Sequence, residues 1–349
     1  MSDGTERPRL SVVIPAYNVE EYITDCLESL VDQQIADLEV IVVDDGSTDS
    51  TAEMAVEFAK HHARWMVVCV DRRGPGGARN EGILHASGEF LAFVDADDVI
   101  PPDGYRVLLE AITASGSDLA TGNVIRFNAA RTWQSKLHAD EFGEPARGIA
   151  MIERPGLLND TNSTNKIYRR SYWNGLHFPF PERGVYEDIP VAINALANAK
   201  RLDIVAEPVY LWRIREGSNL STSQRLTEQS VIEDRARAVE KVREVLRNSP
   251  AAALVQPWNR RALLLDFARY LEVSDRADSG AQQALLNAIE IHRDNSGSDA
   301  FELLPGPEKR AYRKIFVSGQ AGIPAAARTL RRARFVRRVR GRIQRTIRR

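Results

Sequence analysis

The chain has 349 residues, of which 43% are hydrophobic and 27% are charged, so it is long and apolar enough for two domains with buried cores and is not a disordered chain. Its two cysteines, Cys26 and Cys69, lie in apolar segments, which argues against a disulfide framework and favours a reducing cytoplasm. No run of about 18 apolar residues exists, and residues 1–9 are polar, so neither a membrane span nor a signal peptide is expected.

Strand and helix patterns alternate through the first 130 residues. Apolar runs predict strands at residues 10–14, 38–43, 66–70, 90–94 and 118–127. The segments between them predict helices, with Ser47 or Thr48 capping the second and Pro101 or Pro102 opening the fourth. This alternation predicts an α/β fold with a mostly parallel sheet and helices on both faces.

The rest of the chain is less regular and then becomes helical. Further expected elements are a short helix near 171–175, a helix at 190–199, strands at 202–206 and 209–213, and helices at 227–247, 257–273 and 282–291. We therefore expect a disordered start (1–8), a main domain (9–222, with halves 9–130 and 131–222), a helical region (223–327) and a basic tail (328–349).

The tail concentrates positive charge. Residues 328–349 hold eleven Arg and no Asp or Glu, so the net charge of −1 combines +11 there with −12 in the rest of the chain. Val336, Val339, Ile343 and Ile347 share one helical stripe, which favours a basic amphipathic helix on an anionic membrane surface. A solubilising tail and another anionic partner remain alternatives, and nucleic acid is not the expected partner.

The expected strand at 90–94 ends in Asp95-Ala-Asp97-Asp98. Carboxylates just beyond a buried parallel strand lie at the sheet edge where α/β proteins bind ligands. Oxygen-only ligation favours Mg²⁺ or Mn²⁺, ions that usually remain bound to substrate phosphates. Taken alone, an acidic surface turn is an equally good interpretation, because Asp is common in turns.

Three other strand ends carry polar residues. The first strand leads into Pro15-Ala-Tyr17-Asn18, where Tyr17 is suited to stacking on a nucleobase and Asn18 to capping a helix. After the second strand, one carboxylate of the Asp44-Asp45 pair is suited to accepting a base N–H or a ribose hydroxyl. The third leads into a glycine-rich loop at 74–77 followed by Arg79, a combination that favours phosphate. This loop is neither a dinucleotide fingerprint nor a P-loop.

With these motifs in order, residues 9–130 resemble the nucleotide-binding half of a family 2 glycosyltransferase with the GT-A fold. The matching motifs begin at Val13, Val42, Gly77 and Val94. The resemblance implies that Asp95 contacts the ribose and that Asp97 binds Mg²⁺ or Mn²⁺. It further implies that Pro15, Tyr17 and Asp45 hold the base and that Arg79 contacts the base or the diphosphate region. Asn18 and Asn80 belong to the same motifs and are expected among the substrate-binding residues.

The acceptor half carries two further matches. Asn165-Lys166 and Tyr186-Glu187-Asp188 resemble the second conserved region of the family, where one carboxylate of the acidic pair is the general base. Of this pair we expect Asp188 to be the base, with Glu187 as a positioning residue or a neighbour on the metal side. The alternative is that both carboxylates only favour the N-terminus of the following helix.

The segment from Tyr210 to Ser218 resembles a loop that closes over the diphosphate in these enzymes. It supplies Arg213 and Arg215 for phosphate, and has no His in the place where some relatives hold the metal. The alternative for Arg213 is a structural role.

The resulting hypothesis is a metal-dependent inverting glycosyltransferase that uses a nucleotide-diphospho-sugar, most simply a UDP-sugar. Its acceptor would be a hydroxyl of a glycan or of a wall or capsule polymer, and its expected location is the cytoplasmic face of the cell membrane. The alternatives are a non-catalytic nucleotide-sugar-binding or scaffold protein and a nucleotidyltransferase. The intact carboxylates argue against the first, and the residues after the first strand argue against the second.

Overall fold

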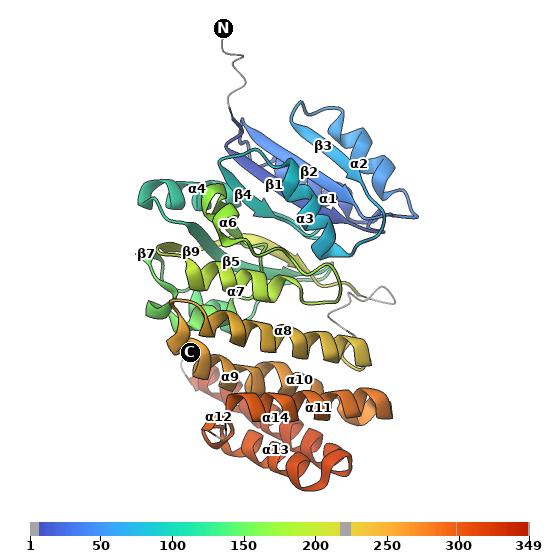
Figure 1. Ribbon diagram of the computed structural model, residues 1–349, viewed down its shortest axis with the longest axis vertical. Helices are drawn as coiled ribbons and strands as arrows, with labels where there is room; N and C mark the ends of the chain where they lie inside the picture. The colour runs from blue at the N-terminus through green and yellow to red at the C-terminus, as the bar shows by residue number, and fades with distance from the viewer. Residues whose placement is uncertain (1–6, 217–224, 298, 348–349) are drawn as a thin grey trace. The chain divides into compact units, whose positions relative to one another are not determined.

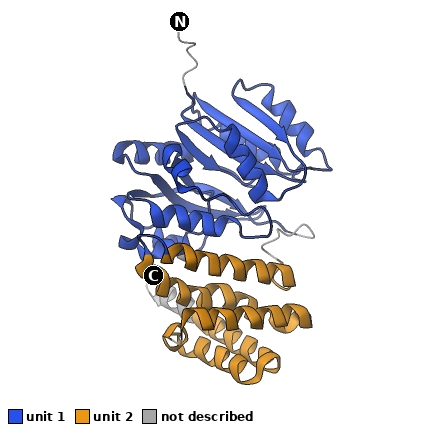
Figure 2. Ribbon diagram, viewed as in Figure 1, with its two compact units in different colours: residues 1–219, 248–251 blue, residues 220–247, 252–349 orange. Residues whose placement is uncertain are grey.

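The computed structural model describes residues 7–216, 225–297 and 299–347. The chain forms two compact units, which are Met1–Asn219 with Asn248–Ala251 and Leu220–Arg247 with Ala252–Arg349 (Figure 2). The predicted domain boundary at 222–223 and residues 1–6 of the predicted disordered start lie outside the described residues.

The first half of unit 1 is a run of four parallel strands, each followed by a helix (Figure 1). In space the strands follow the order β3-β2-β1-β4. Their bounds are β1 Leu10–Ala16, β2 Leu38–Asp44, β3 Trp65–Cys69 and β4 Phe90–Phe93. The helices are α1 Ile23–Val31, α2 Thr51–Ala59, α3 Pro75–His85 and α4 Gly104–Ser115.

The alternation of side chains along these strands builds a core on each face of the sheet. Val12 and Ile14 belong to the cluster that buries residues of α1 and α4. Val13 points to the opposite face, where a methyl group on Gly82 of α3 would lie 2.4 Å from its side chain. Helices therefore cover both faces, as the sequence predicts, and glycine at position 82 lets α3 lie close to the sheet.

The second half of unit 1 mixes strand directions. The sheet continues from β4 in the order β8-β5-β9-β7, and β6 pairs with the far end of β5. Strand β8 runs antiparallel to both neighbours, whereas β5 and β9 are parallel. The bounds are β5 Leu119–Phe127, β6 Thr132–Gln134, β7 Ala146–Ile149, β8 Lys166–Arg169 and β9 Leu202–Arg213.

Two strands expected at 202–206 and 209–213 are a single strand, β9. Its pairing with β5 shifts register around Asn123. A side chain at the neighbouring Gly122 would lie 2.6–2.7 Å from Val205 and Val209, so glycine allows the strands to remain together through the irregularity. Strands β6, β7 and β8 were not predicted, because they have three or four residues and lack the continuous apolar run that marks the equally short β4.

Two predicted helix starts were wrong. Helix α2 begins at Thr51 after Ser50, and not at Ser47 or Thr48. Helix α4 begins at Gly104, beyond the two prolines. Unit 1 also contains α5 Lys136–Glu141, α6 Arg170–Leu176 and α7 Asp188–Asn198, of which the last two lie where helices were expected.

Unit 2 is helical in all its described elements, as the sequence predicts for this region. Its longer helices are α8 Gln229–Arg247, α11 Ser279–Ser296, α13 Gly306–Ser318 and α14 Ile323–Ile347. Between α8 and α11, α9 (Val255–Arg261) passes through a π-helical stretch at Ala262–Phe267 into α10 (Ala268–Leu271). The short α12 covers Asp299–Glu302. Among the described residues no helix has the length and apolar character needed to cross a membrane.

Helix α14 includes most of the predicted basic tail. Its start is part of the unit 2 core, because Ala326, Ala327 and Leu330 are buried. Arg331 pairs with Asp275, and Arg337 pairs with Glu308. The side chains of Val339, Ile343 and Ile347, which define the predicted membrane-facing stripe, lie outside the described part of the chain, as do residues 348 and 349.

Candidate active site

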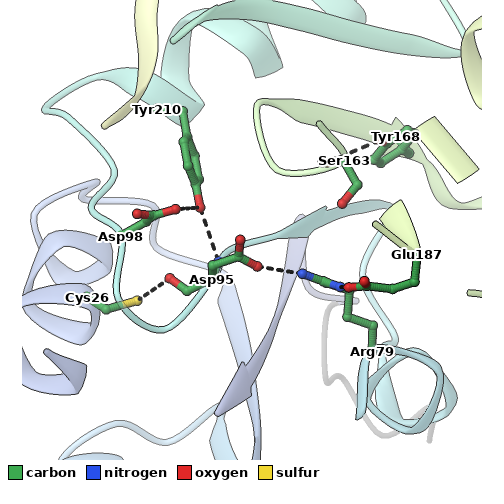
Figure 3. A network of polar contacts seen from close by, with 8 residues as sticks. All are labelled: Cys26, Arg79, Asp95, Asp98, Ser163, Tyr168, Glu187 and Tyr210. Atoms are coloured by element: carbon green, nitrogen blue, oxygen red, sulfur yellow. Dashed lines mark hydrogen bonds and ion pairs between the residues drawn. The ribbon is translucent and has the colours of Figure 1, made fainter. Parts of the chain in front are cut away.

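A buried arginine joins the two halves of unit 1. Arg79 of α3 donates from one guanidinium nitrogen to Asp95 Oδ1 at 2.5 Å and from the other to Glu187 Oε1 at 2.6 Å (Figure 3). Burial alone lowers the pKa of Arg79, but the Asp95 and Glu187 carboxylates more than offset this and raise it above its ordinary value. The arginine therefore stays charged and holds the end of β4 beside the start of α7.

The three carboxylates after β4 have different environments. Asp95 keeps its side chain 41% exposed although it pairs with Arg79. Asp98 is buried, and its two oxygens accept from the Tyr210 hydroxyl at 2.6 Å and the Arg213 N–H at 2.7 Å. Burial raises the pKa of Asp98 well above its usual range, and Asp97 and Asp95 raise it further. Asp98 thus anchors this turn to β9, while Asp95 remains open to a ligand.

Tyr210 completes this anchor. Its hydroxyl accepts from the Asp95 N–H at 3.2 Å while donating to Asp98, and the Cys26 thiol lies 3.8 Å from the Asp95 carbonyl oxygen (Figure 3). The backbone of the carboxylate turn is therefore fixed from two sides. Sequence reasoning missed Tyr210 in this role, because β9 and β4 are not adjacent in the sheet.

Two arginines, Arg213 and Arg215, donate hydrogen bonds to Asp97. Its Oδ2 accepts from Arg215 Nε at 2.7 Å, and its carbonyl oxygen accepts from Arg213 Nε at 2.7 Å. In addition, Arg213 forms an ion pair with Asp25 at 2.9 Å, which fits a structural role for this arginine, the alternative considered above. The last two residues of the segment from Tyr210 to Ser218 lie outside the described residues.

The residues of this site suit a divalent cation that has most of its ligands from substrate phosphates and water. No group of three His, Cys, Asp or Glu side chains within the described residues could hold a metal ion. Mg²⁺ and Mn²⁺ are commonly held by one or two carboxylates together with substrate phosphates and water. Asp97, with hard oxygen donors at the carboxyl end of the sheet, fits that pattern, and a bound ion would neutralise charge on a diphosphate.

Asp45 supports the glycine-rich loop. Its two carboxylate oxygens accept from the N–H groups of Arg73 at 2.6 Å and Gly74 at 2.9 Å. A side chain at Gly76 would lie 2.0 Å from the carbonyl oxygen of Pro181, and one at Gly74 would lie 2.8 Å from that of Glu182. These two glycines are thus required by the close approach of the 181–182 backbone, a reason that the sequence did not reveal.

Asn80 holds the same segment. Its side-chain amide donates to the Phe180 carbonyl at 2.8 Å and accepts from the Phe180 N–H at 2.9 Å. The Phe180 ring contacts Phe93 of β4 edge-on at 5.1 Å between centroids, and the Arg79 guanidinium lies 5.3 Å from the ring centre. The segment before Glu187 is therefore fixed by hydrogen bonds and by aromatic packing.

The first strand end also makes contacts within the protein. The Arg72 guanidinium stacks over the Tyr17 ring at 3.5 Å, on a face where a nucleobase was expected. Asn18 does not cap α1. Its side-chain amide instead pairs with Thr48, accepting from the N–H at 2.8 Å. Pro15 lies half-buried within β1.

The acidic pair sits where the backbone is strained. Tyr186 has a φ of 72°, a left-handed conformation that bulky residues rarely adopt and that often marks functional sites. Glu187 is buried against Arg79, whereas Asp188, in the first turn of α7, is only half-buried. Of the two carboxylates, Asp188 is therefore the more exposed.

The Asn165-Lys166 motif forms a separate buried cluster. Lys166 Nζ lies 2.8 Å from Asp160 Oδ2, and both side chains are fully buried. Asn165 donates to Asp160 at 2.9 Å and to the Gly122 carbonyl at 2.7 Å. Burial lowers the pKa of Lys166, an effect that Asp160 opposes. This cluster ties the segment before β8 to β5.

The strand order and the carboxylates at one edge of the sheet define an α/β glycosyltransferase fold of the GT-A type. Residues 11–176 match Glycosyl transferase family 2, the family that the sequence motifs resemble. The putative glycosyltransferase EpsH of Bacillus subtilis (strain 168) is 33% identical over 225 residues, which are 63% of this chain and 65% of EpsH. The poly(ribitol-phosphate) beta-N-acetylglucosaminyltransferase TarS of Staphylococcus aureus (strain Mu50 / ATCC 700699) is 31% identical over 221 residues, 62% of this chain and 37% of TarS.

The matched segments thus span less than two thirds of these relatives. The crystal structure of S. aureus TarS 1–349 in complex with UDP-GlcNAc superposes with a TM-score of 0.75 at 22% identity, over 93% of this chain and 92% of that one. A mannosyltransferase from Pyrobaculum calidifontis in complex with GDP-Man and Mn²⁺ gives a TM-score of 0.54 at 19% identity, over 93% and 87%. These likenesses confirm the predicted fold, including the helical region after the sheet.

The close contact at Gly76 yields a test of the loop. We expect Gly76→Ala to lower the free energy of unfolding by about 1–3 kcal/mol, because its methyl group would overlap the Pro181 carbonyl. Urea unfolding followed by fluorescence measures this. Gly175→Ala, where an added methyl meets nothing within 4 Å, is the matched control and should be neutral or slightly stabilising. Equal effects of the two substitutions would contradict the assigned packing.

Proposed function

We propose that this protein is an inverting glycosyltransferase that moves a sugar from a UDP-sugar to a hydroxyl of a glycan or of a wall or capsule polymer. The observation that carries the proposal is the double ion pair of Arg79, which holds donor-side Asp95 and acceptor-side Glu187 on one guanidinium. TarS, by name, acts on poly(ribitol-phosphate), and a structure with the same fold contains UDP-GlcNAc. The first supports a polymer acceptor and the second a UDP-sugar donor.

On the donor side, the exposed oxygen surface of Asp95 is assigned to the ribose. Tyr17 supplies a ring for the base, which requires Arg72 to move aside or to cover the opposite face. Pro15 and Asp45 complete the base side, with Asp45 acting partly through the loop it holds. Arg79, Asn80 and Asn18 act chiefly as positioning residues, because their polar groups are engaged by the protein.

On the acceptor side, Asp188 is assigned as general base. It takes the proton of the acceptor hydroxyl as that oxygen bonds to the anomeric carbon and the bond from this carbon to the diphosphate oxygen breaks. The nucleoside diphosphate leaves with the electron pair. Glu187 positions Asp188 through its pair with Arg79. Attack from the face opposite the leaving group inverts the anomeric centre.

Asp97 is assigned as the residue that would hold Mg²⁺ or Mn²⁺, an ion that neutralises charge on the leaving diphosphate when bound. The Mn²⁺ in the Pyrobaculum calidifontis complex is a precedent within this fold. Arg215 adds positive charge at the same place, and Arg213 shapes it through its contacts with Asp98 and Asp25.

We further propose that the end of α14 binds the anionic inner surface of the cell membrane. Residues 338–349 add six arginines beyond Arg337, after the part of the helix that packs into unit 2. The exposed Phe335 and Val336 lie directly before them. An amphipathic helix with this composition binds anionic lipid through its apolar stripe and its charges together.

Replacing the proposed base should separate binding from transfer. We expect Asp188→Asn to lower kcat by about 10²–10⁴-fold, the usual contribution of a general base, while UDP-sugar affinity changes little. Isothermal titration with the UDP-sugar and a steady-state transfer assay measure the two quantities. Asp140→Asn, at an exposed position in α5, is the control. Unchanged transfer by Asp188→Asn would place the base elsewhere.

Metal removal tests the role of Asp97. Transfer should cease in EDTA, return when Mn²⁺ is added, and fall to background in Asp97→Ala at any Mn²⁺ concentration, because the diphosphate charge is then not neutralised. A coupled assay for released UDP provides the measurement. Equal turnover with and without EDTA would refute the proposed metal dependence.

The membrane proposal is tested without deleting the helix. Changing Arg338, Arg340, Arg342 and Arg345 to Gln should weaken binding to vesicles containing anionic lipid by about 10²-fold or more, because each arginine near such a surface contributes about 1 kcal/mol. Sedimentation with the vesicles gives the bound fraction, and neutral phosphatidylcholine vesicles are the control. If the wild-type protein does not prefer the anionic vesicles, the proposal fails.

A further inference from the structure

The carboxylate assigned to the metal already has a cationic partner. Arg215 Nε lies 2.7 Å from Asp97 Oδ2, and the two side chains are only 20% and 17% exposed. The Arg215 guanidinium also lies 5.0 Å from the centre of the Tyr22 ring. The pair is therefore partly shielded from water, where attraction between unlike charges and repulsion between like charges are both stronger.

The neighbouring arginine does not share this position. Arg213 directs its N–H to Asp98, its Nε to the carbonyl oxygen of Asp97 and its terminal nitrogen to Asp25. None of these contacts uses the Asp97 carboxylate. Arg213 thus holds the segment in place, and Arg215 alone of the two contacts the carboxylate of Asp97.

We propose that Arg215 is the resident counter-ion of Asp97 in the donor-free protein, and that a divalent cation gains Asp97 only together with a nucleoside diphosphate. This inference rests on the proposed function. A cation that arrives alone must break the ion pair and leave a guanidinium next to a divalent charge. A diphosphate offers Arg215 a new anionic partner, so that the exchange keeps every charge paired.

The arrangement therefore makes metal and donor binding cooperative. The coupling between two ligands is reciprocal, so whatever weakens Mn²⁺ binding in the absence of UDP increases the gain in Mn²⁺ affinity that UDP brings. Removing the guanidinium should strengthen the binding of Mn²⁺ alone and reduce that gain by a similar factor. Lysine at the same position should preserve the competition, because it preserves the charge.

The experiment measures Mn²⁺ binding by the loss of the electron paramagnetic resonance signal of the free ion, with and without UDP. It uses the full chain as wild type, Arg215→Gln, Arg215→Lys and Arg106→Gln. Arg106 is a matched control, because it is an arginine of unit 1 paired with Asp103 and Glu110 at exposed positions. Circular dichroism during heating shows that each variant is folded.

We expect Arg215→Gln to bind Mn²⁺ alone about fivefold or more tightly than wild type, and the gain from UDP to shrink correspondingly. Arg215→Lys and Arg106→Gln should resemble wild type. Equal Mn²⁺ affinity of wild type and Arg215→Gln without UDP would overturn the inference, as would absence of Mn²⁺ binding by both. If UDP promotes Mn²⁺ binding equally in both, only this inference fails, whereas a wild-type protein that binds neither UDP nor Mn²⁺ contradicts the proposed function itself.

Discussion

The candidate site depends on one buried guanidinium placed between two carboxylates. Arg79 pairs with Asp95 after β4 and with Glu187 before α7, 108 residues from Arg79 along the chain. Removing one partner of a buried pair leaves an uncompensated charge, which typically costs about 3–5 kcal/mol. The two halves of unit 1 are therefore held together at the proposed site of transfer.

Other contacts support the same junction. The Asn80 side chain forms two hydrogen bonds with the Phe180 backbone. The glycines at 74 and 76 allow the 181–182 backbone to lie close to the glycine-rich loop. Strain at Tyr186 is retained beside the acidic pair. Together these interactions leave Glu187 buried and Asp188 half-buried, so neighbouring carboxylates of similar chemistry have different surroundings.

The turn after β4 shows the same principle in its three Asp residues. Asp98 is consumed by Tyr210 and a backbone N–H, Asp97 faces Arg215, and Asp95 remains partly open. A carboxylate that is fully satisfied by protein groups stabilises the turn, and one that keeps open oxygen surface can bind a ligand. The motif thus combines a carboxylate that is satisfied within the protein with one that keeps open oxygen surface.

The sequence by itself determined the α/β class, the helical region and the group of polar strand ends, because periodicity and the order of short motifs are local properties. It could not show that Arg79 reaches Glu187, that Asp98 binds Tyr210, or that Arg72 and Arg215 contact Tyr17 and Asp97. Those contacts join segments far apart in the chain. Only the tertiary structure brings them into contact, and it thereby decides which polar groups already have partners within the protein.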